Sequence, residues 1–198
     1  MTEEDNRVRI LLLGHSYIRR LGQFMESNLE YGNLQLNDHQ VQVFYFGLGG
    51  ARLSEGSMFN HHDLQDALSC QPHVVYIHIG CNDLKITSAE NITDRLIDLA
   101  MFISSKPGIR IVCISQLFPF PSTAECLDSI KKINESLHTK FSNSCNVFYW
   151  RHRGFWKPEK NIFLSDQTHL NFEGQKRYWI SVRYAMKSAC SSLGIELL

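Results

Sequence analysis

Ser16 lies where a short apolar run gives way to a helical pattern of hydrophobic residues. The run from Val8 to Leu13 ends at Gly14, and Ser16 follows at the start of the helical pattern. A serine at such a turn can point its hydroxyl out of the sheet, with its own amide at the positive end of a helix. That position suits a nucleophile. Because serine is also a preferred helix N-cap, the first loop alone leaves both interpretations open.

Asp166 and His169 form a second candidate group near the other end of the sequence. In a tight turn or one helical turn, two residues three positions apart face the same way, so the carboxylate can hold one imidazole nitrogen. The other nitrogen is then free to take a proton from Ser16. An ordinary surface aspartate and a loop histidine are the alternative interpretation of this pair.

Hydrolysis of an ester also needs donors directed at the oxyanion that develops on the carbonyl oxygen. Three groups could provide them: the backbone amide of Ser16, the backbone amide of Gly50 and the side-chain amide of Asn82. Taken singly, Gly50 could equally be a flexible turn, and Asn82 with Asp83 a turn dipeptide after a strand.

Strands and helices alternate along the whole sequence. The strand candidates are short apolar runs, and the helix candidates show apolar residues at intervals of three and four. This rhythm predicts a parallel α/β sheet with helices on both faces, because parallel strands need long crossovers. The carboxyl ends of the strands then bring the polar loops together. The expected strands are 8–13, 41–46, 74–79, 109–114 and 146–149, and the expected helices are 18–29, 64–68, 92–103, 127–141 and 172–190.

Four sequence blocks resemble those of the SGNH hydrolase superfamily, also called GDSL esterases and lipases. They are Gly14-His15-Ser16, Gly50, Gly80-Cys81-Asn82-Asp83 and Asp166-Gln167-Thr168-His169, in that order along nearly the whole chain. The resemblance implies a single domain over residues 1–198 with a flavodoxin-like three-layer α/β/α sandwich and a parallel sheet of about five strands. It also implies a serine hydrolase mechanism.

The resemblance assigns a role to each candidate residue. Ser16 would be the nucleophile, His169 the general base and acid, and Asp166 the residue that orients His169. Ser16, Gly50 and Asn82 would form the oxyanion hole. One departure is His15, which stands where the family usually has aspartate in the first block. It could pack without chemical effect, or it could add a titrating group beside the nucleophile.

Charge and composition limit the partners. Lys+Arg and Asp+Glu both number 20, so no field over the whole chain would attract nucleic acid or anionic lipid. A local patch such as 151–160 mixes cations and aromatic residues. It could be an ordinary solvated loop, one wall of an acyl cleft through Phe155 and Trp156, or an anchor for such an anionic partner. No apolar run approaches the roughly 18 residues of a membrane span. We therefore expect a cytoplasmic protein with no transmembrane segment.

These observations predict a carboxylic ester hydrolase that uses a Ser-His-Asp triad and an acyl-enzyme, with no metal and no organic cofactor. Short acyl groups such as acetyl are expected, on a small-molecule, glycan or lipid alcohol. Two alternatives stay open. The chain could be a weak or inactive SGNH-fold binding module, or an esterase-like domain encoded by a retrotransposon that associates with nucleic acid or anionic lipid. The sequence leaves the oligomeric state open.

Overall fold

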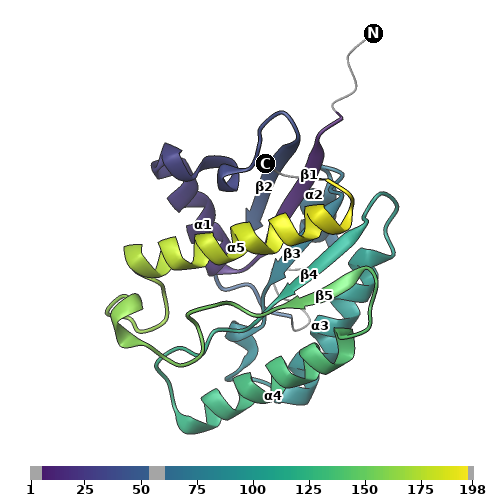
Figure 1. Cartoon of the computed structure of the whole chain (residues 1–198). Helices are drawn as coiled ribbons and strands as arrows, with labels where there is room; N and C mark the ends of the chain where they lie inside the picture. Colours follow the sequence, from purple (N-terminus) through teal and green to yellow (C-terminus); the bar gives the residue numbers. More distant parts are fainter. Residues whose placement is uncertain (1–5, 54–60, 196–198) are drawn as a thin grey trace.

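The computed structural model describes residues 6–53 and 61–195. Its centre is a parallel sheet of five strands in the order β2-β1-β3-β4-β5, which confirms the predicted fold class (Figure 1). The strands are β1 (Val8–Gly14), β2 (Val41–Gly47), β3 (Val74–His78), β4 (Ile111–Ser115) and β5 (Val147–Trp150).

Helices cover both faces of this sheet. Figure 1 shows α5 crossing one face, next to α1, while α3 and α4 lie on the opposite side. The helices are α1 (Ser16–Ser27), α2 (His61–Leu68), α3 (Ala89–Ser104), α4 (Ala124–Phe141) and α5 (Phe172–Ser192), and the short 3-10 helices are η1 (Leu29–Gln35), η2 (Cys81–Asp83) and η3 (Lys160–Ile162). The first helix ends before Leu29, which the apolar spacing had included. Leu29 instead begins η1 and is 90% exposed.

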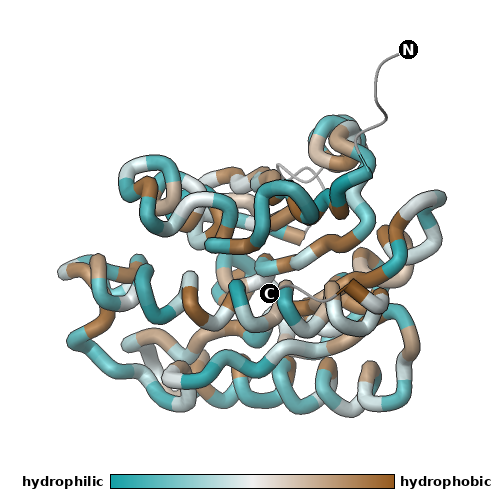
Figure 2. Tube along the Cα trace, turned by 45° about the horizontal axis from the view of Figure 1, so that its top comes forward, coloured by the Kyte–Doolittle hydropathy of each residue, from teal (hydrophilic) through white to brown (hydrophobic). Residues whose placement is uncertain are grey.

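Side chains along β1 alternate between two hydrophobic layers. Ile10 and Leu12 pack toward α1 and α5, whereas Leu11 and Leu13 pack toward the layer that contains α3 and α4. Because both faces of the strand are covered, its sequence is continuously apolar rather than alternating with polar residues. Along the helices, the tube in Figure 2 changes repeatedly between polar and apolar colours, as expected of helices with one buried face.

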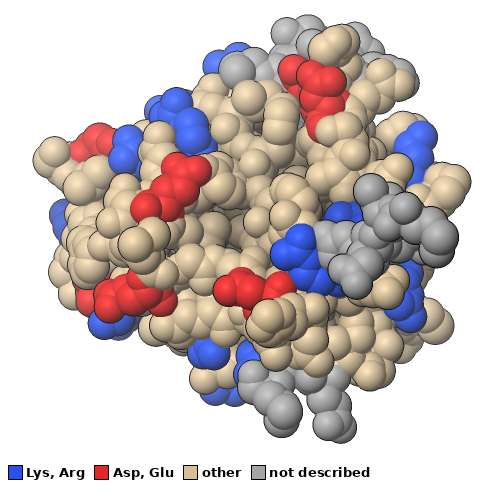
Figure 3. All heavy atoms as spheres, turned by 90° about the horizontal axis from the view of Figure 1, so that it is seen from above, with Lys and Arg blue, Asp and Glu red and all other residues tan. Residues whose placement is uncertain are grey.

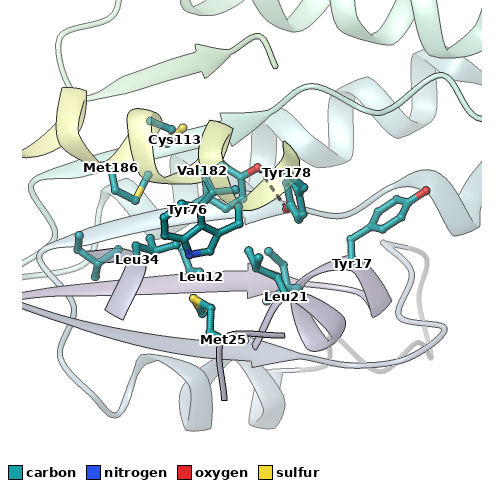
Figure 4. Packing of buried hydrophobic residues seen from close by; sticks show 14 of the residues in the cluster. Leu12, Tyr17, Leu21, Met25, Leu34, Tyr76, Cys113, Tyr178, Val182 and Met186 are labelled. Carbon is teal, nitrogen blue, oxygen red and sulfur yellow. Dashed lines mark hydrogen bonds between the residues drawn. The ribbon is translucent and has the colours of Figure 1, made fainter. Parts of the chain in front are cut away.

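The layer under α5 contains polar atoms as well as aliphatic packing. Figure 4 shows Leu12, Leu34, Val182 and Met186 among the residues of this cluster, with Tyr76 and Tyr178 beside them. The two tyrosine hydroxyls are 3.3 Å apart and hydrogen-bonded. A hydroxyl buried in such a layer needs a partner, because an unpaired one loses its hydration without compensation.

Gly14 is required by close packing at the end of β1. It pairs with Gly47 on one side and with His78 on the other. A Cβ atom on Gly14 would lie 2.1 Å from the carbonyl oxygen of His78, a distance that no real Cβ contact shows. The missing side chain therefore lets β1 and β3 run together to their carboxyl ends. The chain passes from β1 to β2 on one side of β1 and then to β3 on the other side. The carboxyl ends of β1 and β3 therefore form the switch point in strand order where α/β proteins place their sites.

Surface charges of both signs are interspersed on the face shown in Figure 3, and neither sign gathers into one patch there. This distribution agrees with the balanced totals of 20 cationic and 20 acidic residues. Among the residues that the structure describes, no helix is both long and apolar enough to cross a membrane.

Candidate active site

Ser16 is the first residue of α1 and is only 8% exposed. His15, and not Ser16, caps this helix: its Nδ1 atom accepts a hydrogen bond of 3.3 Å from the backbone amide of Tyr17. The interpretation of Ser16 as an N-cap is therefore wrong. Its hydroxyl is left to interact outside the helix, while its amide stays at the positive end of the helix.

Ser16, His169 and Asp166 form a continuous series of side-chain contacts. The Nε2 atom of His169 lies 3.1 Å from Oγ of Ser16, and its Nδ1 atom lies 2.7 Å from Oδ2 of Asp166. Hydrogen bonds from the His169 amide, the His169 ring and the Thr168 amide hold the pKa of Asp166 well below its usual value. An ionised carboxylate keeps a proton on Nδ1 and leaves Nε2 to accept one.

The loop that carries Asp166 and His169 is ordered by its own backbone. The Oδ1 atom of Asp166 accepts hydrogen bonds of 2.9 Å from the amides of both Thr168 and His169. Between them, Gln167 has a φ of 55°, in the left-handed region that a tight turn of this kind needs. The aspartate thus shapes the turn with one oxygen and orients the imidazole with the other.

Gly50 and Asn82 come together through the segment that follows β2. The Nδ2 atom of Asn82 donates a hydrogen bond of 2.8 Å to the carbonyl oxygen of Ala51, next to Gly50. Because a primary amide carries two hydrogens, this bond leaves a second one for another acceptor. Gly50 has a φ of 75°, a backbone conformation that favours glycine. Its amide therefore lies in a turn directly before Ala51, the residue that Asn82 binds.

No protein-family model matches the chain, and no curated protein matches its sequence. Solved structures do match it over most of their lengths. A carbohydrate esterase of family 3 from Talaromyces cellulolyticus has 15% identity and a TM-score of 0.64, with 96% of this chain and 100% of that one covered. A GDSL-like lipase from Bacteroides thetaiotaomicron has 15% identity, a TM-score of 0.62 and coverages of 96% and 91%. For a lipolytic G-D-S-L family member from Veillonella parvula the values are 14%, 0.65, 90% and 97%. The chain has the fold of the SGNH hydrolases.

In this chain with the SGNH fold, Asp83 contacts the segment that follows β2, a role beyond that of a turn residue. Asp83 is completely buried, and both of its carboxylate oxygens accept hydrogen bonds from the amide of Leu53, at 3.1 and 3.0 Å. Arg95 binds the carbonyl oxygen of the same leucine at 3.0 Å. Asp83 and Asn82, adjacent on η2, therefore hold two points of the segment that carries Gly50.

His15 belongs to a group of three buried histidines, with His78 and His152. Burial, and then the nearby charge of His169, lowers the pKa of His15 to about 3, so its ring stays neutral at ordinary pH. Burial lowers the pKa of His152 to about 3 and that of His78 well below its usual value. His15 is thus a neutral cap packed against His78, with ring centroids 5.3 Å apart, and it adds no cation beside Ser16.

These histidines continue into a buried hydrogen-bonded series. The Nδ1 atom of His78 lies 2.7 Å from Oη of Tyr178, whose hydroxyl contacts that of Tyr76. The Tyr76 hydroxyl then lies 2.9 Å from Nε2 of His152. His78 is therefore a core histidine whose Nδ1 atom has a hydrogen-bond partner.

One side-chain cluster among the described residues has the donor types of a metal site. His15, His78 and Cys81 each offer an atom within 4.8 Å of the others. However, Nδ1 of His15 accepts the Tyr17 amide hydrogen, so a neutral ring carries its proton on Nε2 and keeps no lone pair for a metal. Burial also raises the pKa of the Cys81 thiol to about 12. These residues fit a packed, neutral core better than a metal centre.

Proposed function

We propose that this protein hydrolyses carboxylic esters through an acyl-enzyme formed on Ser16. The observation that carries the proposal is the contact series from Oγ of Ser16 to His169, at 3.1 Å, and from His169 to Asp166, at 2.7 Å. A serine, a base in contact with it and a third group that orients the base are the parts of an activated nucleophile. The similar structures, a carbohydrate esterase, a GDSL-like lipase and a lipolytic G-D-S-L family member, agree with this class.

In the first half of the proposed reaction, Oγ of Ser16 bonds to the carbonyl carbon of the ester while its proton passes to Nε2 of His169. The carbonyl π electrons move onto oxygen and give a tetrahedral oxyanion. When the carbonyl re-forms, the bond to the alcohol oxygen breaks, and that oxygen takes the proton from His169. The alcohol leaves, and the acyl group stays on Ser16.

Water reverses these steps in the second half. His169 takes a proton from water as the water oxygen bonds to the acyl carbon. It then returns a proton to Oγ of Ser16 as the bond from Oγ to the acyl carbon breaks and the acid leaves. Throughout, the ionised Asp166 balances the charge of the imidazolium. The proposed route needs no metal and no organic cofactor, because residues of the chain make every proton transfer.

The oxyanion needs donors fixed before the reaction begins. In this proposal they are the amides of Ser16 and Gly50 and the Nδ2 group of Asn82. The bond from Asn82 to Ala51 supports this assignment, since it holds the side chain and the Gly50 segment in one arrangement. Donors that do not have to reorganise during the reaction stabilise the transition state most.

We propose that the preferred ester substrates carry short acyl groups, above all acetyl. A long acyl chain requires an apolar pocket continuous with the nucleophile. In the described part of the chain, neither the cavity along β5 nor the one between α3 and α4 is lined by Ser16, Asn82 or His169. The alcohol could belong to a glycan, a lipid or a small molecule, and the carbohydrate esterase among the similar structures makes a glycan the first to test.

Hydrolysis of p-nitrophenyl acetate, butyrate and octanoate by the purified protein tests the proposal. We expect kcat/KM to fall with acyl length, and Ser16→Ala to lower it for acetate by about three orders of magnitude or more. Ser27→Ala, at the exposed end of the same helix, is the matched control and should keep the wild-type rate.

Two results would contradict the proposal. A folded Ser16→Ala variant that hydrolyses acetate as fast as the wild type would remove Ser16 as nucleophile. A folded wild-type protein that is no faster than this variant on all three esters would favour the binding-module alternative.

A further inference from the structure

A cavity lies along β5, the edge strand farthest from β2. It has a volume of about 490 Å³, within the range of pockets that hold small organic ligands. One face of α4 forms one wall, and the segments that follow β4 and β5 form the others. The lining residues that matter for its chemistry are Lys131, Glu135, Tyr149, Arg151, Trp156 and Lys157.

This cavity is separate from the proposed esterase site. Strand β5 is three positions from β1 in the sheet, and neighbouring strands are about 4.8 Å apart, so the two sites are roughly 14 Å from each other across the sheet. None of Ser16, Asn82, Asp166 and His169 lines it. Its occupant therefore need not be the ester.

Buried hydrogen bonds hold the walls of the cavity in place. The side-chain amide of Asn134, on α4, binds both the amide and the carbonyl of Leu117, at 2.9 and 3.0 Å. Gln116 accepts a hydrogen bond from the amide of His152 and donates one to the carbonyl of Phe155. The pocket is thus formed before any ligand arrives, which lowers the entropic cost of binding.

The segment after β5 contains two adjacent aromatic residues, one buried in the core and one exposed. Phe155 is buried and stacks on Phe118 with ring centroids 4.1 Å apart, so it belongs to the core and not to an acyl cleft. Trp156, in contrast, is 54% exposed and lines the cavity. Its neighbour Arg151 places its guanidinium 4.5 Å from the centre of the indole ring.

Positive charge dominates the rim. Lys131, Arg151 and Lys157 carry three positive charges, and Glu135 is the one acid among the lining residues. Glu135 neutralises little of this, because it meets Lys131 only at 3.9 Å and both side chains are largely exposed. An incoming ligand therefore meets a formal charge of +2 beside an exposed aromatic face.

We propose that this cavity binds a phosphate monoester that carries an aromatic ring, the chemistry of a nucleoside monophosphate. The ring stacks against Trp156 and the phosphate lies among Lys131, Arg151 and Lys157. A phosphate dianion matches the charge of the rim, and aromatic stacking uses the exposed part of an indole whose ring Arg151 also contacts. The proposal does not depend on ester hydrolysis.

Isothermal titration calorimetry with AMP tests the site, with adenosine, inorganic phosphate and glucose 6-phosphate as partial ligands. We expect saturable binding of AMP to one site, and binding at least about tenfold weaker for each partial ligand, because each lacks the ring or the anion. Trp156→Ala should weaken AMP about tenfold, and Lys131→Ala and Lys157→Ala about three- to tenfold each.

Two control variants make the test specific. Lys140→Ala removes the same charge from the exposed end of α4, outside the cavity, and should leave AMP affinity unchanged. Ser16→Ala should also bind AMP as the wild type does, whatever its activity. The proposal is overturned if AMP does not bind, if glucose 6-phosphate or phosphate binds equally well, or if Lys140→Ala weakens AMP as much as Lys131→Ala.

Discussion

The hydroxyl of Tyr17 donates a hydrogen bond of 2.6 Å to the carbonyl oxygen of Thr168. Tyr17 follows the proposed nucleophile directly, and Thr168 precedes the proposed base, so one bond joins the start of α1 to the loop of His169. Burial raises the pKa of Tyr17 well above its usual value, and the hydroxyl therefore keeps its proton. The contact links the two segments whose side chains meet at Oγ of Ser16 and Nε2 of His169.

Tyr17→Phe should lower kcat about tenfold while KM changes little, because the ring still packs but the loop of His169 loses its tether. Loss of one buried hydrogen bond should also lower the free energy of unfolding by about 1 kcal/mol. Steady-state kinetics with p-nitrophenyl acetate and urea unfolding measure the two effects. Tyr184→Phe, on the exposed side of α5, is the control, and an unchanged kcat in Tyr17→Phe would show that the tether has no catalytic role.

Asn82→Ala should lower kcat for acetate by about two to three orders of magnitude, the usual cost of removing one side-chain oxyanion donor. The same change frees the carbonyl of Ala51, so the Gly50 segment can move as well. Asn91→Ala, on the exposed face of α3, is the matched control for loss of an amide. If both variants keep the wild-type kcat, Asn82 has no place in the oxyanion hole.

Stability should fall as the solution is made acidic below about pH 6.5. His15, His78 and His152 are neutral and buried, with pKa values lowered by burial, to about 3 for His15 and His152. An unfolded chain binds protons at these residues near pH 6.5, whereas the folded chain binds them at His15 and His152 only near pH 3. Stability is therefore complete above pH 6.5 and is lost progressively as pH falls toward 3.

Each such histidine can contribute a slope of at most about 1.4 kcal/mol per pH unit in that window. Urea unfolding at pH 7.5, 6, 5 and 4 measures the total slope, and His15→Asn should lower it by up to about 1.4 kcal/mol per pH unit, even if the variant is less stable at every pH. His39→Asn, in an exposed loop, is the comparison and should not reduce it as much. A wild-type stability that stays constant from pH 7 to 4 would contradict this account of the buried histidines.

Gly14→Ala should destabilise the fold by several kcal/mol. Its Cβ would lie 2.1 Å from the backbone oxygen of His78, and neither strand can move without disturbing the sheet. Gly32→Ala provides the control, because its Cβ would meet nothing within 4 Å and its φ of −54° suits alanine. Thermal unfolding of both variants gives the comparison. Equal losses of stability would mean that the close approach of β1 to β3 is not what requires Gly14.

Local patterns were enough to predict the frame of this protein. Each apolar run became a strand, and the spacing of Asp166 and His169 was enough to predict their contact, because residues three positions apart meet in a tight turn. The residue that caps α1 could not be chosen for the same local reason. His15 and Ser16 are adjacent, both can accept a hydrogen bond, and only the folded backbone shows that His15 receives it.

Contacts between residues far apart in the chain could not be predicted from the sequence. From the sequence, Asp83 could be only a turn residue beside Asn82. Its hydrogen bonds from the amide of Leu53 form because two loops that are distant in the sequence meet at the carboxyl ends of the strands. The cavity at β5 likewise combines α4 with a segment that follows another strand. Composition indicated cations and aromatic residues in that segment, but not that Phe155 turns inward while Trp156 stays exposed.

Ser16 and His169 are separated by 153 positions, which has a consequence for the order in which the molecule acquires activity. During synthesis, the proposed nucleophile leaves the ribosome before its base, on a segment whose sheet neighbours β2 and β3 follow it along the chain. Its base arrives only with the loop before α5, and α5 covers the face of the sheet beneath. Since chains grow at roughly 5–20 residues per second, a nascent chain exists for several seconds with a serine that cannot be activated. Catalysis would therefore begin only when the last layer of the sandwich has closed.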